Sequence, residues 1–352
     1  MNTKWICFSI LCLSALLHAD EDNKPEQSSH AVQPYEPPAP VPPSNSPAAV
    51  APAQSGPTPW LTGPLIAPVG SVVPYGDFLI ESYVYCTTNT GTYNKHWNSV
   101  SAPRNFFSLN PQFLCFFGLT PWMDINIVPQ FFYNTTSNQN SVNFGDLPIA
   151  LDFQLLDPAA TPYFPGIKFI VRETFPTGPF QRLNPGKLLT DQTGAGTFAT
   201  TFDLVLYKVY HLSGNHFLST TYSAAYTVNT PVHVHGFNTY GGGYGTNGRA
   251  LPGNSFQGII SFEFTFNQNW VFAIDNVYTH TDETQFFGTV GTTSTGAAAS
   301  VGSPSSEQIS FAPAIEYNFS SHFGIEAGCW FTAWGRNSTE FRSGVINFAY
   351  TY

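Results

Sequence analysis

The sequence ends in a stretch of strict two-residue alternation, and this feature most constrains the fold. From Gly344 onward one face carries large apolar side chains and the other carries small or polar ones; the first set is Gly344, Ile346, Phe348, Tyr350 and Tyr352, and the second is Val345, Asn347, Ala349 and Thr351. A strand of this kind is typical of a membrane β-barrel, because one face meets lipid and the other meets a wet lumen. We therefore expect a transmembrane barrel that closes with this strand.

Twelve segments of about ten or more residues show this period of two. They span residues 77–88, 105–117, 122–133, 146–156, 167–176, 198–211, 216–228, 255–267, 269–280, 307–319, 322–333 and 341–352. Tilted membrane strands need about 9–11 residues, roughly twice the usual soluble strand, and bacterial single-chain barrels have an even strand number. The sequence predicts an all-β fold, an antiparallel transmembrane β-barrel of about 12 strands within residues 61–352.

The joins between these segments alternate in length. Short joins fall at 118–121, 158–165, 212–215, near 268 and at 320–321, whereas longer ones fall at 89–104, 134–145, 177–197, 229–254, 281–306 and, more modestly, 334–340. Outer-membrane barrels have short periplasmic turns and long outer loops, so we assign the long joins to the outside. Proline cannot donate to a strand ladder, so bulges or shifted boundaries are expected at Pro111, Pro129, Pro148 and Pro313.

Composition favours the membrane over a soluble β-sandwich or jelly roll. Charged residues make up 10% of the chain and aromatic residues 16%, whereas soluble domains carry about 25% charged residues. A soluble sandwich would have shorter strands and a charged outward face. After the first residues no stretch approaches the roughly 20 apolar residues of a membrane helix.

The amino-terminal region predicts export to the outer membrane of a Gram-negative-type envelope. Lys4 precedes an apolar run over residues 5–17, which is typical of a signal peptide, here residues 1–19 with cleavage near Ala19. Lipidation at Cys12 is a less favoured alternative. Residues 20–60 are rich in proline and small residues, which predicts a disordered periplasmic leader; a plug or a partner-binding tail is the alternative.

The alternation points most strand charges into the lumen. The candidate lumen-lining residues are Glu81, Asp124, Asp152, Lys168, Arg172, Asp203, Glu263, Asp275, Glu316 and Glu326. Such charges either satisfy one another in a narrow lumen or select solutes, in which case an acidic lumen favours cations or neutral molecules over anions. Inward Tyr83, Tyr85 and Tyr207 would offer surfaces for apolar or aromatic solutes.

The residue patterns predict no catalytic residues, no cofactor and no metal site. A phospholipase-like barrel would need a mid-strand histidine on the lipid face beside its nucleophile, whereas His211, His216 and His322 fall near the short turns. His233 and His235 share one face of an extended loop segment, without the Cys or carboxylate cluster of a metal site. The region from residue 61 holds 10 basic and 17 acidic residues, a net charge of −7, which argues against a nucleic-acid partner.

Several short motifs resemble one family, the outer-membrane transporters of the MetA pathway of phenol degradation. They are Val73–Asp77 before the first strand, Phe144–Leu156 with its Gly-Asp start, Phe175–Gly178, Gly194–Gly196 and Gly335–Asn337. The resemblance covers most of the barrel and implies a barrel that moves small compounds, including apolar ones, across the outer membrane. It supplies no catalytic residues, and the long proline-rich leader departs from the family pattern.

The sequence thus predicts an outer-membrane barrel that lets small, including apolar or aromatic, molecules pass through a narrow acidic lumen. The alternative is a closed barrel that acts as a surface adhesin or antigen through its loops; an outer-membrane phospholipase-like hydrolase is the least favoured interpretation. The expected partners are outer-membrane lipid, an unidentified small-molecule solute and the barrel-assembly machinery.

Overall fold

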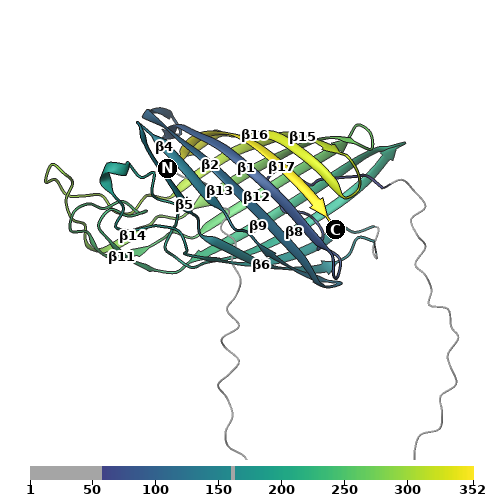
Figure 1. Ribbon diagram of the computed structural model, residues 1–352, viewed down its shortest axis with the longest axis horizontal. Helices are drawn as coiled ribbons and strands as arrows, with labels where there is room; N and C mark the ends of the chain where they lie inside the picture. Colours follow the sequence, from purple (N-terminus) through teal and green to yellow (C-terminus); the bar gives the residue numbers. More distant parts are fainter. Residues whose placement is uncertain (1–57, 160–162) are drawn as a thin grey trace, which may run out of the picture. The chain divides into compact units, whose positions relative to one another are not determined.

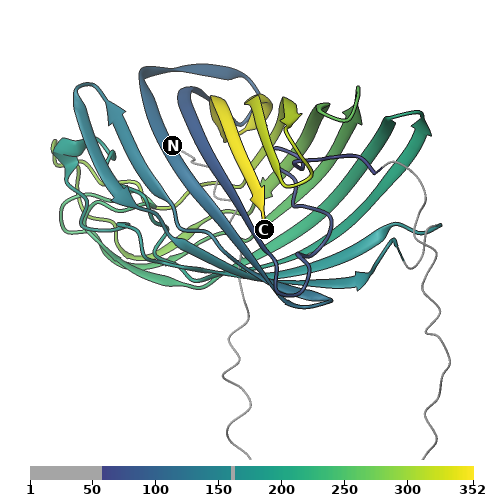
Figure 2. The ribbon, with the colours of Figure 1, turned by 45° about the vertical axis from the view of Figure 1, so that its right-hand side comes forward.

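A closed antiparallel barrel is the main feature of the computed structural model, which describes residues 58–159 and 163–352. The predicted signal peptide of residues 1–19, Cys12 and residues 20–57 of the predicted leader lie outside the described residues. Figures 1 and 2 show the strands side by side and steeply tilted, with the loop segments gathered at one end.

The barrel wall has twelve strand positions, each filled by one long strand or by two short strands in line. The strands are β1 (Phe78–Tyr93), β2 (Ser99–Thr120), β3 (Met123–Ile127), β4 (Phe131–Thr136), β5 (Gln139–Phe144), β6 (Leu147–Leu156), β7 (Gly166–Phe175), β8 (Ala199–Ser213), β9 (His216–Asn229), β12 (Ser255–Thr265), β13 (Trp270–Thr281), β15 (Ser306–Asn318), β16 (Phe323–Arg336) and β17 (Thr339–Thr351). Strands β3 and β4 together fill one strand position, and β5 and β6 fill the next, because β3 pairs with β6 and β4 pairs with β5. The predicted number of 12 strands is confirmed.

The first and last strands close the barrel. Strand β1 pairs antiparallel with both β17 and β2. At the end of this seam the N–H of Phe78 donates to the carbonyl of Tyr352 (3.0 Å), and the N–H of Tyr352 donates to the carbonyl of Phe78 (2.8 Å). The terminal alternating segment therefore is the closing strand.

The two faces of the wall differ as the alternation predicts. On β12, Ser261 and Glu263 are buried inside, whereas Ile260 and Phe262 are exposed on the outer face. Strand β17 repeats this arrangement, with Asn347 inside and Phe348 outside. Exposed apolar and aromatic side chains thus cover the outer face.

Three of the expected long loops are shorter in the structure. The joins expected at 89–104, 134–145 and 334–340 shrink to residues 94–98, 137–138 and 337–338, because the flanking strands continue beyond the apolar region. The extensions are rich in Thr, Ser and Asn, which continue the ladder without an apolar face. Only the joins at 176–198, 230–254 and 282–305 remain long.

Only one of the four strand prolines interrupts a strand. Pro129 lies in the gap between β3 and β4. Pro111, Pro148 and Pro313 stay in register with Val84, Thr174 and Ile274 on one side. On the other side the strand pairing is interrupted beside Pro111, where β2 meets β3 and β4, and beside Pro313, where β15 meets β16. Open ladder positions, rather than bulges, accommodate these missing N–H groups.

The three long loops fold on themselves at one end of the barrel, here called the loop end. The opposite end, with the joins at 214–215, 266–269 and 319–322, is the turn end. Strands β10 (Val232–His235), β11 (Asn247–Leu251) and β14 (Gln285–Thr289) form a separate three-stranded sheet. Val232, Val234 and Ala250 make its core, with Phe180 and Phe286 packed against them. A short 3-10 helix, η1 (Pro185–Lys187), lies in the preceding loop. No helix among the described residues is long and apolar enough to cross a membrane.

Candidate functional site

The chain before β1 runs through the barrel interior; we call residues 60–74 the lumenal segment (Figure 2). Its backbone N–H groups donate to carboxylates of the inner wall, from Thr62 to Glu316 Oε2 (2.8 Å) and from Ile66 to Asp275 Oδ2 (2.9 Å). A third such bond joins the Val73 N–H to Asp124 Oδ2 (2.6 Å). Buried backbone N–H groups need acceptors, so these carboxyl oxygens hold the segment at three points.

Amide side chains and apolar packing add to this attachment. The side chain of Asn318 accepts from Thr62 Oγ1 (3.0 Å) and donates to the Trp60 carbonyl (3.2 Å). Leu65, 1% exposed, packs in a cluster with residues of the inner wall, among them Ala312 and Ala314. The segment is therefore part of the packed interior.

Glycine permits the closest approach between segment and wall. A Cβ atom at Gly70 would overlap the Tyr207 side chain near its base, including its Cβ and Cγ atoms. A Cβ at Gly324 of β16 would overlap the Thr62 side chain. Tyr207, expected to offer a solute surface, instead covers the lumenal segment.

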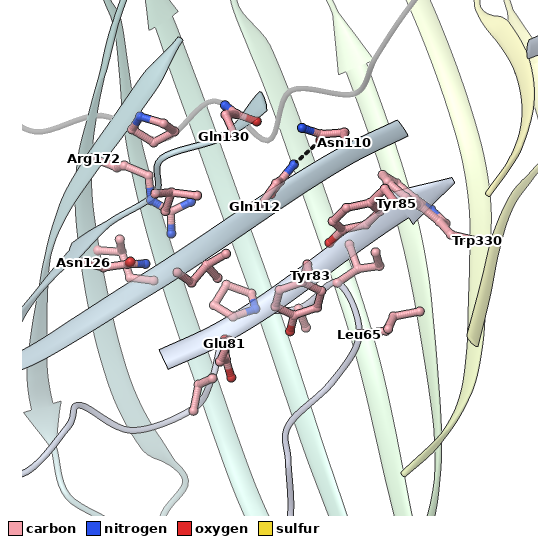
Figure 3. A pocket seen from close by; sticks show the side chains of 18 of the residues that line it. Leu65, Glu81, Tyr83, Tyr85, Asn110, Gln112, Asn126, Gln130, Arg172 and Trp330 are labelled. Carbon is pink, nitrogen blue, oxygen red and sulfur yellow. Dashed lines mark hydrogen bonds between the residues drawn. The ribbon is translucent and has the colours of Figure 1, made fainter. Parts of the chain in front are cut away.

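A cavity of about 120 Å³ lies between the lumenal segment and the wall of β1 and β2; we call it the central cavity. Tyr83, Tyr85 and Trp330 form one side, and Figure 3 shows Arg172 and Asn126 on the opposite side. The Tyr83 and Tyr85 rings are stacked with centroids 5.8 Å apart, and Trp330 meets Tyr85 edge-on at 6.4 Å. Aromatic rings thus face amides and a guanidinium across a small space.

Two further cavities adjoin the central one. The loop-end cavity has a volume of about 720 Å³ and shares Asn89 with the central cavity. The turn-end cavity has a volume of about 210 Å³ and shares Val69 and Glu81 with it. Three spaces therefore follow one another along the lumen, and Val69 of the lumenal segment stands between the last two.

All ten predicted lumen-lining residues are buried, and they divide into groups. Glu81, Asp152, Lys168 and Arg172 line the central cavity, where Lys168 Nζ pairs with Asp152 Oδ2 at 3.0 Å. The second group comprises Asp124, Asp275 and Glu316, which hold the lumenal segment.

The last three residues, Asp203, Glu263 and Glu326, line none of the three cavities. Asp203 accepts from the Ser223 hydroxyl (2.8 Å). One oxygen of Glu263 and both oxygens of Glu326 are buried without a hydrogen-bond partner among the described residues. A role in solute selection stays a prediction for the whole set.

Sequence reasoning missed the lumenal segment. We assigned the plug alternative to residues 20–60, whereas the chain that fills the lumen is residues 60–74. Its available signal is the return of large apolar residues at Trp60, Leu61, Leu65 and Ile66 after the proline-rich stretch. The segment shows no strand alternation, so it invites no structural assignment.

The histidines have local partners. His211 Nε2 lies 2.8 Å from the Gly214 carbonyl, and His216 Nδ1 lies 3.1 Å from the Thr265 carbonyl, both at the turn end. The His233 and His235 rings stack at 6.2 Å on β10. Within the described residues no group of three or more His, Cys, Asp or Glu side chains is placed to hold a metal ion.

Solved structures share this fold. The COG4313 outer membrane channel from Pseudomonas putida F1 aligns with a TM-score of 0.60 at 14% identity, over 80% of this chain and 98% of that one. More distant are the NanC porin (TM-score 0.39, 8% identity, 76% and 98%) and the β domain of the Bordetella autotransporter BrkA (0.41, 8%, 79% and 100%). No family model and no curated protein matches the sequence. The first likeness confirms the fold, an outer-membrane type of barrel.

Proposed function

We propose that this protein is an outer-membrane channel for small molecules, in which the lumenal segment narrows the path. The supporting observation is the chain of three cavities through the barrel, interrupted by the lumenal segment at Val69. A pore lumen normally contains enough polar surface to hold water. Here the tightly held segment replaces much of that water, so the channel is narrow at rest.

The membrane location is part of the proposal. Exposed aromatic and aliphatic side chains cover the outer face of the strands, and such a surface is compatible with lipid rather than with water. Outer-membrane lipid and the barrel-assembly machinery are therefore the proposed partners. Residues 1–19 would direct export, and residues 20–60 would connect the lumenal segment to the periplasm.

The proposed solutes are small and include apolar or aromatic compounds. Tyr83, Tyr85 and Trp330 give the central cavity an aromatic side, on which rings stack favourably. The resemblance to transporters of the MetA pathway of phenol degradation agrees with this class.

The loop sheet favours a second candidate function, surface recognition by an adhesin or antigen. Strands β10, β11 and β14 have their own small core, and their outer face exposes His233, Arg249 and Phe287. A packed loop structure of this kind can present a stable binding face. It does not explain the cavities, which is why the channel is the principal proposal.

Osmotic swelling of proteoliposomes tests the principal proposal. Mature protein should admit erythritol, a small uncharged solute, faster than empty liposomes do, and a variant lacking residues 60–74 should admit it faster still. A folded protein that admits no erythritol in either form would contradict the channel and leave the adhesin. Trp334→Ala provides the control, because Trp334 is 55% exposed and lines none of the three cavities.

A further inference from the structure

We infer that the resting path, with the lumenal segment in place, selects uncharged solutes no larger than about one six-membered ring. This inference rests on the proposed channel function and concerns its specificity. It differs from the expectation for an acidic lumen, which is preference for cations, because the excess of acidic residues does not line the path.

The central cavity is balanced in formal charge. Its charged lining residues are two acids, Glu81 and Asp152, and two bases, Lys168 and Arg172. Lys168 and Asp152 are already paired at 3.0 Å and both are almost fully buried. A charged solute would lose its water in this space without gaining an uncompensated opposite charge, so desolvation opposes it.

The loop-end cavity strengthens this argument. Among the side chains that the structure describes, those that line it carry no charge. Leu183, Leu188 and Phe237 contribute apolar surface, and Gln192 and Asn238 contribute amides. A solute that arrives from the loop end therefore meets a neutral, partly apolar space before it reaches the central cavity.

The unbalanced acids are engaged elsewhere. Asp124, Asp275 and Glu316 each accept an N–H group of the lumenal segment through one oxygen, and none of the three lines the central cavity. Their charge would become available to a solute only after the segment left. A lumen with an excess of acidic residues can thus still select neutral solutes.

The volume of the central cavity sets the size limit. At about 120 Å³ it is slightly smaller than the apolar cavity of about 150 Å³ that is known to hold benzene. One ring fits, whereas two fused rings require movement of the wall or of the segment. The amides Asn110, Gln112 and Gln130 would then bind a single polar substituent.

Three probes that share one ring and differ in charge test the inference. Nicotinamide is neutral, nicotinate is an anion and 1-methylnicotinamide is a cation at pH 7. We would measure their uptake by proteoliposomes that contain the mature full chain, corrected for empty liposomes. The expected result is uptake of nicotinamide about ten-fold or more faster than either ion. Equal uptake of 1-methylnicotinamide would overturn the inference and leave the channel function standing.

Two substitutions that each remove one formal charge test the direction of the effect. Arg172→Gln should raise the ratio of cation to anion uptake several-fold, and Glu81→Gln should lower it, because each shifts the cavity balance by one formal charge. Asp282→Asn is the control, because Asp282 is 55% exposed and lines none of the three cavities. Shifts of the two variants in the same direction, with folding verified by heat-modifiable gel mobility, would overturn the inference.

A variant lacking residues 60–74 distinguishes failure of this inference from failure of the proposed channel function. If only this shortened chain admits the probes, the resting path is closed and the inference is wrong, although the barrel is a channel. If neither form admits any probe, both the inference and the proposed function are wrong. We expect the shortened chain to admit the cation as well, since the acidic wall is then uncovered.

Discussion

Two sides of the same lumen are built from the same strand alternation, but one side binds the lumenal segment and the other borders a cavity. On one side Asp275 and Glu316 of β13 and β15 bind the backbone of the lumenal segment. On the other side Tyr83 and Tyr85 of β1 border a cavity that the segment leaves open. The inward orientation of a side chain therefore does not by itself show that it lines a solute path. Its contacts decide whether it does.

The difference has a physical basis in the needs of a backbone. A chain that lies inside a barrel without strand partners must find acceptors for its buried N–H groups. Carboxylates supply them at Asp124, Asp275 and Glu316. The wall beside the central cavity has no such chain to satisfy, so aromatic and amide side chains can occupy it.

Removal of two anchors should produce the largest change. Asp275→Ala and Glu316→Ala combined leave two buried N–H groups without an acceptor, and each such group costs about 1–3 kcal/mol. We therefore expect a cysteine placed at Ala67 to react with a water-soluble maleimide at least about 30-fold faster. The labelling would be measured with Cys86, Cys115 and Cys329 replaced by alanine. Asp203→Asn is the matched control, since its partner is Ser223 in the wall; equal acceleration there would contradict the anchoring role.

A steric change should loosen the segment without altering charge. Gly70→Ala places a methyl group against the base of the Tyr207 side chain, and such overpacking typically costs about 1–3 kcal/mol. We expect labelling at Ala67→Cys to rise about ten-fold. Gly344→Ala, where a Cβ would meet no atom within 4 Å, should have no effect. Unchanged labelling in Gly70→Ala would show that the segment is not tightly seated there.

A smaller effect is expected from the aromatic side of the central cavity. Trp330 is 6% exposed and lines the cavity, whereas Trp334 on the same strand is 55% exposed on the outer face. Trp330→Ala should remove about 3–5 kcal/mol of stability and, by widening the cavity, speed erythritol swelling about three-fold. Trp334→Ala should leave the swelling rate unchanged. The reverse order would place the path outside the central cavity.

An ion pair at the loop-end rim should have the smallest effect on solute uptake. Arg336 Nε lies 3.2 Å from Glu307 Oε2, and both side chains are about one-quarter exposed. Exposed ion pairs contribute about 0–1 kcal/mol, and neither residue lines any of the three cavities. Arg336→Ala should therefore change erythritol swelling less than about two-fold. A larger change would mean that the rim, rather than the lumenal segment, limits uptake.

The wall could be predicted from sequence because each strand carries its own pattern. Period-two alternation identified all twelve strand positions and placed residues such as Glu263 inside and Phe262 outside. Strand ends were less predictable, because Thr, Ser and Asn continue β1 and β2 beyond the apolar region. Such residues are equally common in loops.

The contents of the lumen could not be predicted in the same way. The lumenal segment binds through backbone N–H groups at Thr62, Ile66 and Val73, and a backbone group has no residue signature. The central cavity gathers residues from strands far apart in the chain, among them Tyr83, Arg172 and Trp330. A single sequence does not show that these side chains meet.

Single-channel recording tests the central claim most directly, that the lumenal segment limits the path and covers acidic charge. The mature full chain and the variant lacking residues 60–74 would be compared in a planar bilayer. We expect small or absent steps from the full chain and larger, cation-selective steps from the shortened chain. Equal conductance and equal ion selectivity in the two forms would contradict the account.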